Sequence, residues 1–120
     1  MKKFMAVFTG TASAREKAER ELTDEAARNE RDRKGMEAWG QWVEAHRDAI
    51  VEMGAPLGRT KRVGRDGISD ISNNLAAYTV VQAPSYDDAA KMFENHPHFT
   101  IFPGDAVEVM ECLPIPGSTG

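Results

Sequence analysis

The sequence predicts a single α+β domain whose elements follow in the order strand, helix, strand, strand, helix, strand. Three observations lead to this fold class. The 120 residues are enough for one domain. Apolar residues recur at helical spacing between residues 36 and 53, and short β-branched or aromatic runs lie on both sides of that stretch. We expect residues 1–113 to form the domain and residues 114–120 to be a flexible tail that lacks the apolar content to fold alone.

The segment KKFMAVFTG is expected to be the first strand. It places Phe4, Ala6 and Phe8 on one face and Met5 and Val7 on the other. Apolar residues on both faces indicate an interior strand that is covered on two sides.

Residues 11–34 are mostly charged, with acids and bases in balance. Partners four residues apart, such as Glu30 and Lys34, indicate a solvated helix or an ordered insert. Thr23, which two acids follow, is the expected N-cap. A mobile lid or a partner-binding arm is the alternative.

The clearest element is an amphipathic helix over residues 36–53. Its apolar stripe repeats at spacings of three and four and consists of Met36, Trp39, Val43, His46, Ile50 and Met53. Gly54, followed by Pro56, should end the helix.

The second half of the chain is expected to contain a hairpin, a strand, a helix and a last strand. LGRTKRV (57–63) and ISDIS (68–72) flank a tight turn at residues 65–67. NLAAYTVVQA is the next strand. Ser85 should begin a helix over residues 86–95, which Pro97 ends. AVEVMECL is the last strand, with Val107, Val109 and Leu113 on one face.

This order is the split βαββαβ unit of ferredoxin-like folds. Such a sheet carries both helices on one face, so Met5, Val7 and Met110 would be stranded on the bare face. A second copy packed sheet on sheet would cover them. We therefore expect a homodimer that forms a dimeric α/β barrel.

Composition narrows the classes of function. A net charge of −4 argues against general nucleic-acid binding, because nothing would offset phosphate repulsion. Cys112 is the single cysteine and can form no internal disulfide. Because no apolar run approaches the roughly 20 residues of a membrane span, we expect no membrane partner and a reducing, cytoplasmic compartment.

Three segments carry a resemblance to a known family: GMEAWGQWVEAH, MGAPLG and HPHFTIFPGDAVEVMECLPIPG. Through these segments the chain resembles the YCII-related (YciI-like) family. The resemblance covers nearly the whole chain apart from residues 11–34 and the tail. It implies a dimer with a small cleft between helix and sheet in each protomer. Some family members remove chloride from hydroxylated chloroaromatics through a histidine and an aspartate. Where better-known members have a D-P pair, this chain has His96-Pro97.

His96 and His98 are the first candidate catalytic residues, because imidazole exchanges protons near neutral pH. The structural alternative is that His96 caps a helix C-terminus and that His98 is exposed. A metal site would need His46, Asp105 or Cys112 as a third ligand. No complete ligand motif is present, so we expect no metal.

His46 lies on the apolar stripe and is the third catalytic candidate, in an assisting or orienting role. Trp39 and Trp42 could hold a planar ring, although tryptophans one turn apart are more often core residues. Arg59 belongs to a basic strand that either protects a sheet edge or clamps an anion. Asp105, after the histidine loop, completes the ligand-binding candidates.

Two classes of function stay open. The first is a small-molecule-binding dimer that performs acid–base chemistry without a cofactor, as a lyase or dehydrochlorinase, on small aromatic or acidic compounds. The second is a non-catalytic ligand-binding or dimerisation module, which the sparse set of polar candidates favours.

Overall fold

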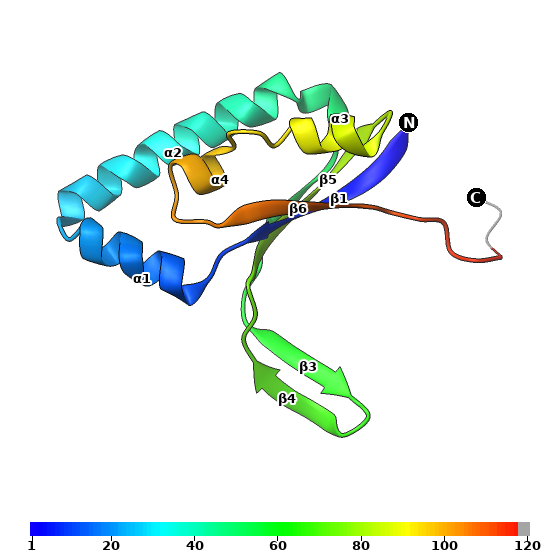
Figure 1. Ribbon diagram of the computed structural model, residues 1–120, viewed down its shortest axis with the longest axis horizontal. Coiled ribbons are helices and arrows are strands. Elements are labelled where there is room, and N and C mark those ends of the chain that lie inside the picture. Colours follow the sequence, from blue (N-terminus) through cyan, green and yellow to red (C-terminus); the bar gives the residue numbers. More distant parts are fainter. Residues whose placement is uncertain (118–120) are drawn as a thin grey trace.

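Four antiparallel strands form one sheet in the order β2-β5-β1-β6, and the helices α2, α3 and α4 lie over one of its faces (Figure 1). The computed structural model describes residues 1–117. The strands of this sheet are β1 (Lys2–Thr9), β2 (Ile50–Pro56), β5 (Leu75–Ala83) and β6 (Ala106–Glu111). The helices are α1 (Ala12–Glu21), α2 (Glu25–Ala45), α3 (Tyr86–Lys91) and α4 (Pro97–Thr100), with a 3-10 turn, η1, at Arg47–Ala49.

The α+β class is confirmed, and the strand order is the one expected of a ferredoxin-like sheet. The first strand, β1, lies in the middle of the sheet, between β5 and β6. Two strands that are adjacent in sequence, β1 and β2, are separated in the sheet by β5. The chain therefore crosses over the sheet through α2, and again through α3 and α4, which is the split arrangement.

The core lies between the sheet and the helices and uses alternate residues of β1. Phe4, Ala6 and Phe8 are fully buried, and they pack with Trp42 of α2 and Phe93, which follows α3. Side chains alternate between the faces of a strand, which explains why one face of β1 supplies this core.

The opposite face of the sheet has no covering layer in the described chain. Met5 is 37% exposed, and Met110, its partner on β6, is 44% exposed. The prediction that β1 is covered on both sides is therefore wrong for the single chain, although its interior position in the sheet is confirmed.

The amphipathic helix ends earlier than its apolar stripe predicts. α2 stops at Ala45, and residues 50–56 form strand β2 instead of the last turns of a helix. Gly54 has a φ of 71°, and a Cβ there would overlap the backbone carbonyl of Tyr78 on β5. This close approach falls at an irregular stretch of the pairing between β2 and β5, where only glycine fits.

Because β2 occupies the edge of the sheet beside β5, the predicted hairpin lies outside the sheet. β3 (Thr60–Gly64) and β4 (Gly67–Ile71) pair only with each other and form a two-stranded arm that extends away from the domain (Figure 1). The predicted turn is confirmed, since Gly64 pairs with Gly67 across it. The arm exposes Val63 and Ile68, which face each other in register.

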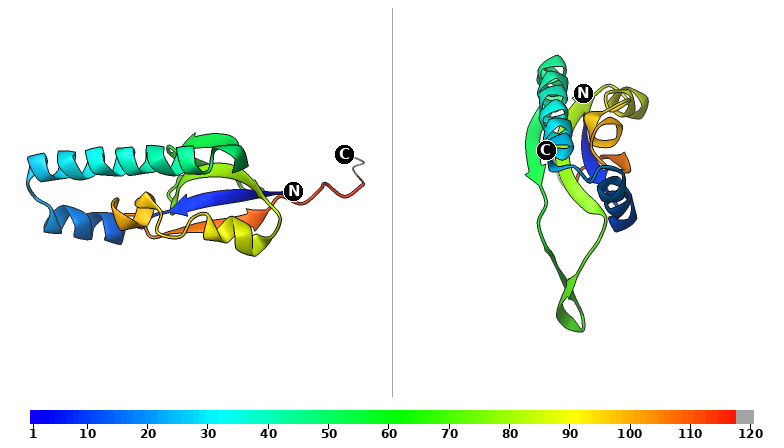
Figure 2. Two further views of the ribbon diagram at one scale, coloured as in Figure 1. Left: turned by 90° about the horizontal axis from the view of Figure 1, so that it is seen from above. Right: turned by 90° about the vertical axis from the view of Figure 1, so that its left-hand side faces the viewer.

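The charged segment forms α1 and the first turns of α2. The start of α2 extends past the sheet beside α1 (Figure 2), and no residue of α1 is buried. Arg33 bridges Glu30 at 2.6 Å and Glu37 at 3.2 Å on the surface of α2. The N-cap of α2 is Asp24 rather than Thr23, because the Asp24 carboxylate accepts the Ala26 N–H.

Two predictions about the C-terminal end need correction or completion. β6 ends at Glu111, so Leu113 lies beyond it and is 72% exposed instead of sharing a face with Val107 and Val109. Residues 114–117 form no helix or strand, and the rest of the predicted tail, 118–120, lies outside the described residues.

Candidate binding site

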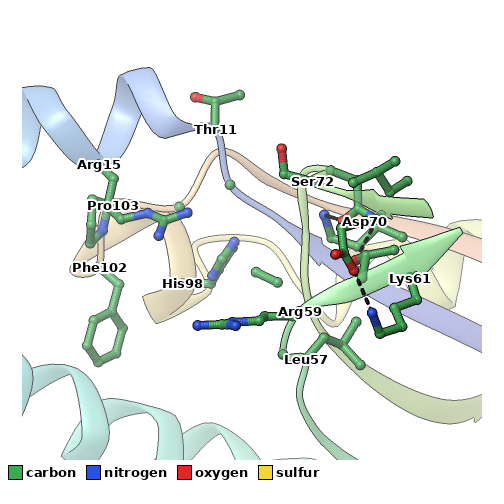
Figure 3. A pocket seen from close by; sticks show the side chains of 18 residues that line it. Thr11, Arg15, Leu57, Arg59, Lys61, Asp70, Ser72, His98, Phe102 and Pro103 are labelled. Atoms are coloured by element: carbon green, nitrogen blue, oxygen red, sulfur yellow. Dashed lines mark hydrogen bonds and ion pairs between the residues drawn. The ribbon is translucent and has the colours of Figure 1, made fainter.

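A cavity of about 1000 Å³ opens where β1 leaves the sheet and enters α1 (Figure 3). Three parts of the chain enclose it: the start of α1, the base of the β3–β4 arm with the chain on either side of it, and the loop between α4 and β6. Its lining comprises Gly10, Thr11, Arg15, Leu57, Gly58, Arg59, Thr60, Lys61, Asp70, Ile71, Ser72, Asn73, Leu75, Ala76, His98, Phe102, Pro103 and Gly104. Polar and apolar groups alternate around it, as expected for a site that orients a small molecule.

His98 is the one histidine in this lining, and its ring is held in place. His98 Nε2 lies 2.7 Å from the carbonyl oxygen of Thr9, at the end of β1. A carbonyl only accepts, so Nε2 carries the proton in the neutral ring and Nδ1 carries a free lone pair. Nδ1 has no hydrogen-bond partner among the described residues and is not one of their fully buried unpaired atoms, so it keeps some access to solvent on a residue that lines the cavity.

Gly104 packs against the same side of the His98 ring, at Nε2 and Cε1. A Cβ at Gly104 would overlap Nε2 and Cε1 of His98, and the Gly104 N–H donates to the His98 carbonyl at 3.0 Å. His98 is only 8% exposed, so the structural alternative of an exposed His98 is wrong. Backbone groups of Thr9 and Gly104 therefore hold the Nε2 side of the ring and leave Nδ1 for a ligand.

His96 is fully buried beside the cavity and does not line it. It is the N-cap of α4, because its Nδ1 accepts the backbone N–H of His98 at 3.0 Å. The alternative that it caps the C-terminus of the preceding helix is therefore wrong: α3 already ends at Lys91, and Pro97 is pre-organised for the first position of α4.

The surroundings of His96 keep its ring neutral. Trp39 stands edge-on at 4.5 Å between ring centroids, and Trp42 lies at 4.8 Å. Because Nδ1 accepts a hydrogen bond, the proton sits on Nε2, which has no hydrogen-bond partner among the described residues. Burial, followed by the neighbouring His98 and His46, lowers the pKa of His96 to about 4.

Trp39, Trp42 and His46 lie in or beside the core rather than around the cavity. The Trp42 indole N–H donates to the Met92 carbonyl at 2.7 Å, and Trp42 packs on Phe93. His46 Nδ1 lies 2.9 Å from the Trp42 carbonyl at the end of α2. The space under the tryptophan-bearing helix is filled by these side chains.

The cavity lining is rich in positive charge. Lys61 on β3 pairs with Asp70 on β4 at 2.7 Å, so these two charges offset each other. Arg59 and Arg15 form no ion pair among the described residues. Figure 3 shows His98 with Arg15 on one side and Arg59 on the other.

Asp105 lies outside the lining of this cavity. Its carboxylate accepts the Thr11 N–H at 2.6 Å, and its own N–H donates to the Thr9 carbonyl at 2.9 Å. The two bonds tie the β1–α1 junction to the loop before β6. Asp105 also borders a smaller hollow of about 260 Å³ on the other side of that loop, between Phe93 and Val107.

Sequence reasoning did not single out Arg15 and Phe102, which the structure adds to the site. Phe102 lies against α2 at Gly35, where a Cβ would overlap the phenyl ring. Gly35 inside an otherwise helical stretch was the available signal, because a buried glycine in a helix marks a close approach by another group. Arg15 has no such signal among its charged neighbours.

Two further properties bear on the class of site. Within residues 1–117, no three His, Cys, Asp or Glu side chains converge in a way that could hold a metal ion. None of the helices in that part of the chain is long and apolar enough to cross a membrane.

Comparison with known proteins supports the fold. No protein-family model and no curated protein sequence matches the chain. Among solved structures, it is similar to 5-chloro-2-hydroxyhydroquinone dehydrochlorinase from Burkholderia phenoliruptrix AC1100, in complex with 2,5-dihydroxybenzoquinone. The TM-score is 0.50, the identity is 14%, and the match covers 98% of both chains. At this identity the likeness shows a shared fold.

Proposed function

We propose that this protein is YCII-like and binds a small acidic or aromatic compound in the cavity beside His98, where His98 exchanges a proton with it without a cofactor. One observation carries the proposal. The His98 ring is fixed by the Thr9 carbonyl at Nε2 and by Gly104, which leaves Nδ1 as a free base. The cavity beside it is bordered by the guanidiniums of Arg15 and Arg59, which form no ion pair in the described part of the chain.

The size and lining of the cavity support a small ligand. A volume of about 1000 Å³ lies at the upper end of the roughly 300–1,000 Å³ typical of small-molecule pockets. Phe102, Leu57 and Pro103 offer apolar surface for a ring, and Arg59 offers a planar fork for a carboxylate or phenolate. His98 as a base and Arg59 as an anion clamp are the two candidate roles from the sequence that this cavity supports.

The reaction type is proposed by analogy with the structural neighbour, whose name describes a dehydrochlorinase. In such an elimination a base removes one proton, its electron pair forms a new double bond, and chloride leaves with the electrons of the C–Cl bond. Loss of HCl requires no oxidant or reductant. His98 Nδ1 would accept the proton, and Arg59 would hold the developing negative charge on a ring oxygen.

Calorimetric titration with benzoate tests the binding step. We expect benzoate to bind one site per chain and Arg59→Gln to weaken it by about tenfold, since a charge-assisted pair is lost. Arg65→Gln is the matched control, because Arg65 lies in the turn of the same arm, outside the cavity lining. Absence of binding, or equal losses in both variants, would contradict the proposal.

A non-catalytic binding module is the second candidate, and one observation favours it. His98 Nε2 donates to a backbone carbonyl and not to a carboxylate, so no acidic side chain supports a positive charge on the ring. Ion chromatography for chloride released from 5-chloro-2-hydroxyhydroquinone separates the candidates. Binding without chloride release would favour the module.

We also propose that two copies pack through their open sheet faces as a dimeric α/β barrel. The exposed Met5 and Met110, which are adjacent across β1 and β6, support this arrangement because a second sheet would bury them. Light scattering at micromolar concentration should give twice the 13.2 kDa chain mass. A monomer at that concentration would remove the proposal, and Met5→Lys should produce one.

A further inference from the structure

We infer that the cavity prefers ligands that carry two negative charges, because Arg15 and Arg59 present two guanidiniums that form no ion pair with an acidic side chain within residues 1–117. The inference rests on the proposed function and narrows its ligand class. Aromatic or acyclic dicarboxylates, and carboxylates with a second acidic group, are the compounds that fit this chemistry.

Arg59 comes from the base of the arm, next to the apolar surface of Leu57. It precedes β3, so its backbone is held by the chain that leaves the sheet after β2. Its guanidinium is exposed to the cavity and forms no ion pair among the described residues. Asp70, the acid of the lining, is already paired with Lys61 at 2.7 Å.

Arg15 comes from the opposite wall, on the first turn of α1. The position of that turn is fixed twice: the Thr11 side chain accepts the Ala14 N–H at 3.1 Å, and the Thr11 N–H donates to Asp105 at 2.6 Å. Glu19 lies four residues along the same helix, but it forms no ion pair with Arg15. The Arg15 side chain extends toward His98 instead (Figure 3).

The charge of this cavity is opposite to that of the whole protein. The chain has a net charge of −4, yet once Lys61 and Asp70 offset each other the charged lining residues left are Arg15 and Arg59. Two like charges that border one hollow repel each other in the empty protein. A ligand with two negative charges relieves that repulsion and pairs with both guanidiniums, whereas a monoanion leaves one of them unpaired.

The experiment compares dianions with a monoanion of the same ring. Phthalate, isophthalate and terephthalate, whose carboxylates are progressively further apart, are titrated beside benzoate at constant ionic strength. We expect at least one of the three to bind about tenfold more tightly than benzoate. In Arg15→Gln that isomer and benzoate should bind with dissociation constants within about twofold of each other.

The matched control is Arg20→Gln, which removes a positive charge from the last turn of the same helix, outside the cavity lining, and should keep the preference. Circular dichroism verifies that all variants remain folded. Equal affinity for benzoate and all three dianions would overturn the inference and leave the proposed function standing. Retention of the preference in Arg15→Gln would overturn it too, whereas failure of every probe to bind would reject the proposed function itself.

Discussion

His98→Gln is expected to lower turnover of any substrate of this cavity by about 10²- to 10⁴-fold, which is the usual contribution of a positioned general base. Glutamine keeps an N–H that can donate to the Thr9 carbonyl, so the junction of β1 with the loop retains its hydrogen bond. It has no nitrogen that can accept a proton near neutral pH. The loss should therefore fall on the rate, while benzoate affinity changes by less than about threefold.

Turnover and calorimetry on the same preparation separate this outcome from unfolding. Wild-type turnover in His98→Gln would contradict the role of His98. An equal loss in His46→Gln would also contradict it, because His46 lies at the end of α2 with its Nδ1 against the Trp42 carbonyl, outside the cavity lining. The combination of a lost rate with retained binding is the result that only a base at Nδ1 explains.

The free energy of unfolding should fall steeply as the pH is lowered from about 6.5 to about 4, because His96 is buried as a neutral ring. Its pKa is about 4 in the folded protein and near 6.5 in the unfolded chain, so the unfolded state binds the proton more tightly. The stabilisation is complete above the unfolded pKa and is lost as pH falls toward the folded pKa. The limiting slope is about 1.4 kcal/mol per pH unit, and the total is about 3 kcal/mol.

Urea unfolding of the wild type and of His96→Asn isolates this effect. The measurements run from roughly pH 7.5 to pH 4, a range that covers the folded and the unfolded pKa of His96. Asparagine is a good N-cap, so it can still accept the His98 N–H at the start of α4, and it does not titrate. The ionisable groups other than His96 are common to both proteins, so their contributions cancel in the difference. The advantage of the wild type should shrink as pH falls, and parallel pH profiles would show that His96 is not buried as a neutral ring.

Local sequence patterns correctly predicted the elements in which the same kind of side chain stays buried from one end to the other, or in which a cap lies next to the element in sequence. β1 has three alternate apolar residues that enter the core, and Ser85 caps α3 by accepting the Asp88 N–H. The pattern misled at residues 46–56, where Ile50 and Met53 continue the helical spacing of α2. There the pairing of β2 with β5, and the approach of Gly54 to Tyr78, override the stripe. The hydrophobic periodicity of a short window cannot report contacts with a strand that is distant in sequence, such as β5.

The candidate site was predicted in part for the same reason. His98 and Arg59 were recognisable from the chemistry of their side chains, and the structure places both at one cavity. Arg15 belongs to a charged segment in which a cavity-lining residue cannot be told from a solvated one. Trp39 and Trp42 were candidates for holding a ligand, with core packing as the alternative, and they lie against the ring of His96.

Nitrogen-15 NMR of the histidine rings during the benzoate titration tests the central claim most directly, because it observes His98 Nδ1, the atom proposed as the base beside the bound ligand. Before ligand is added, His98 should carry its proton on Nε2 and show an unprotonated Nδ1. Saturating benzoate should shift the His98 Nδ1 resonance and leave the ring signals of the buried His96 nearly unchanged. A His98 ring protonated on Nδ1 alone, or a His98 resonance that does not move at saturation, would contradict the account.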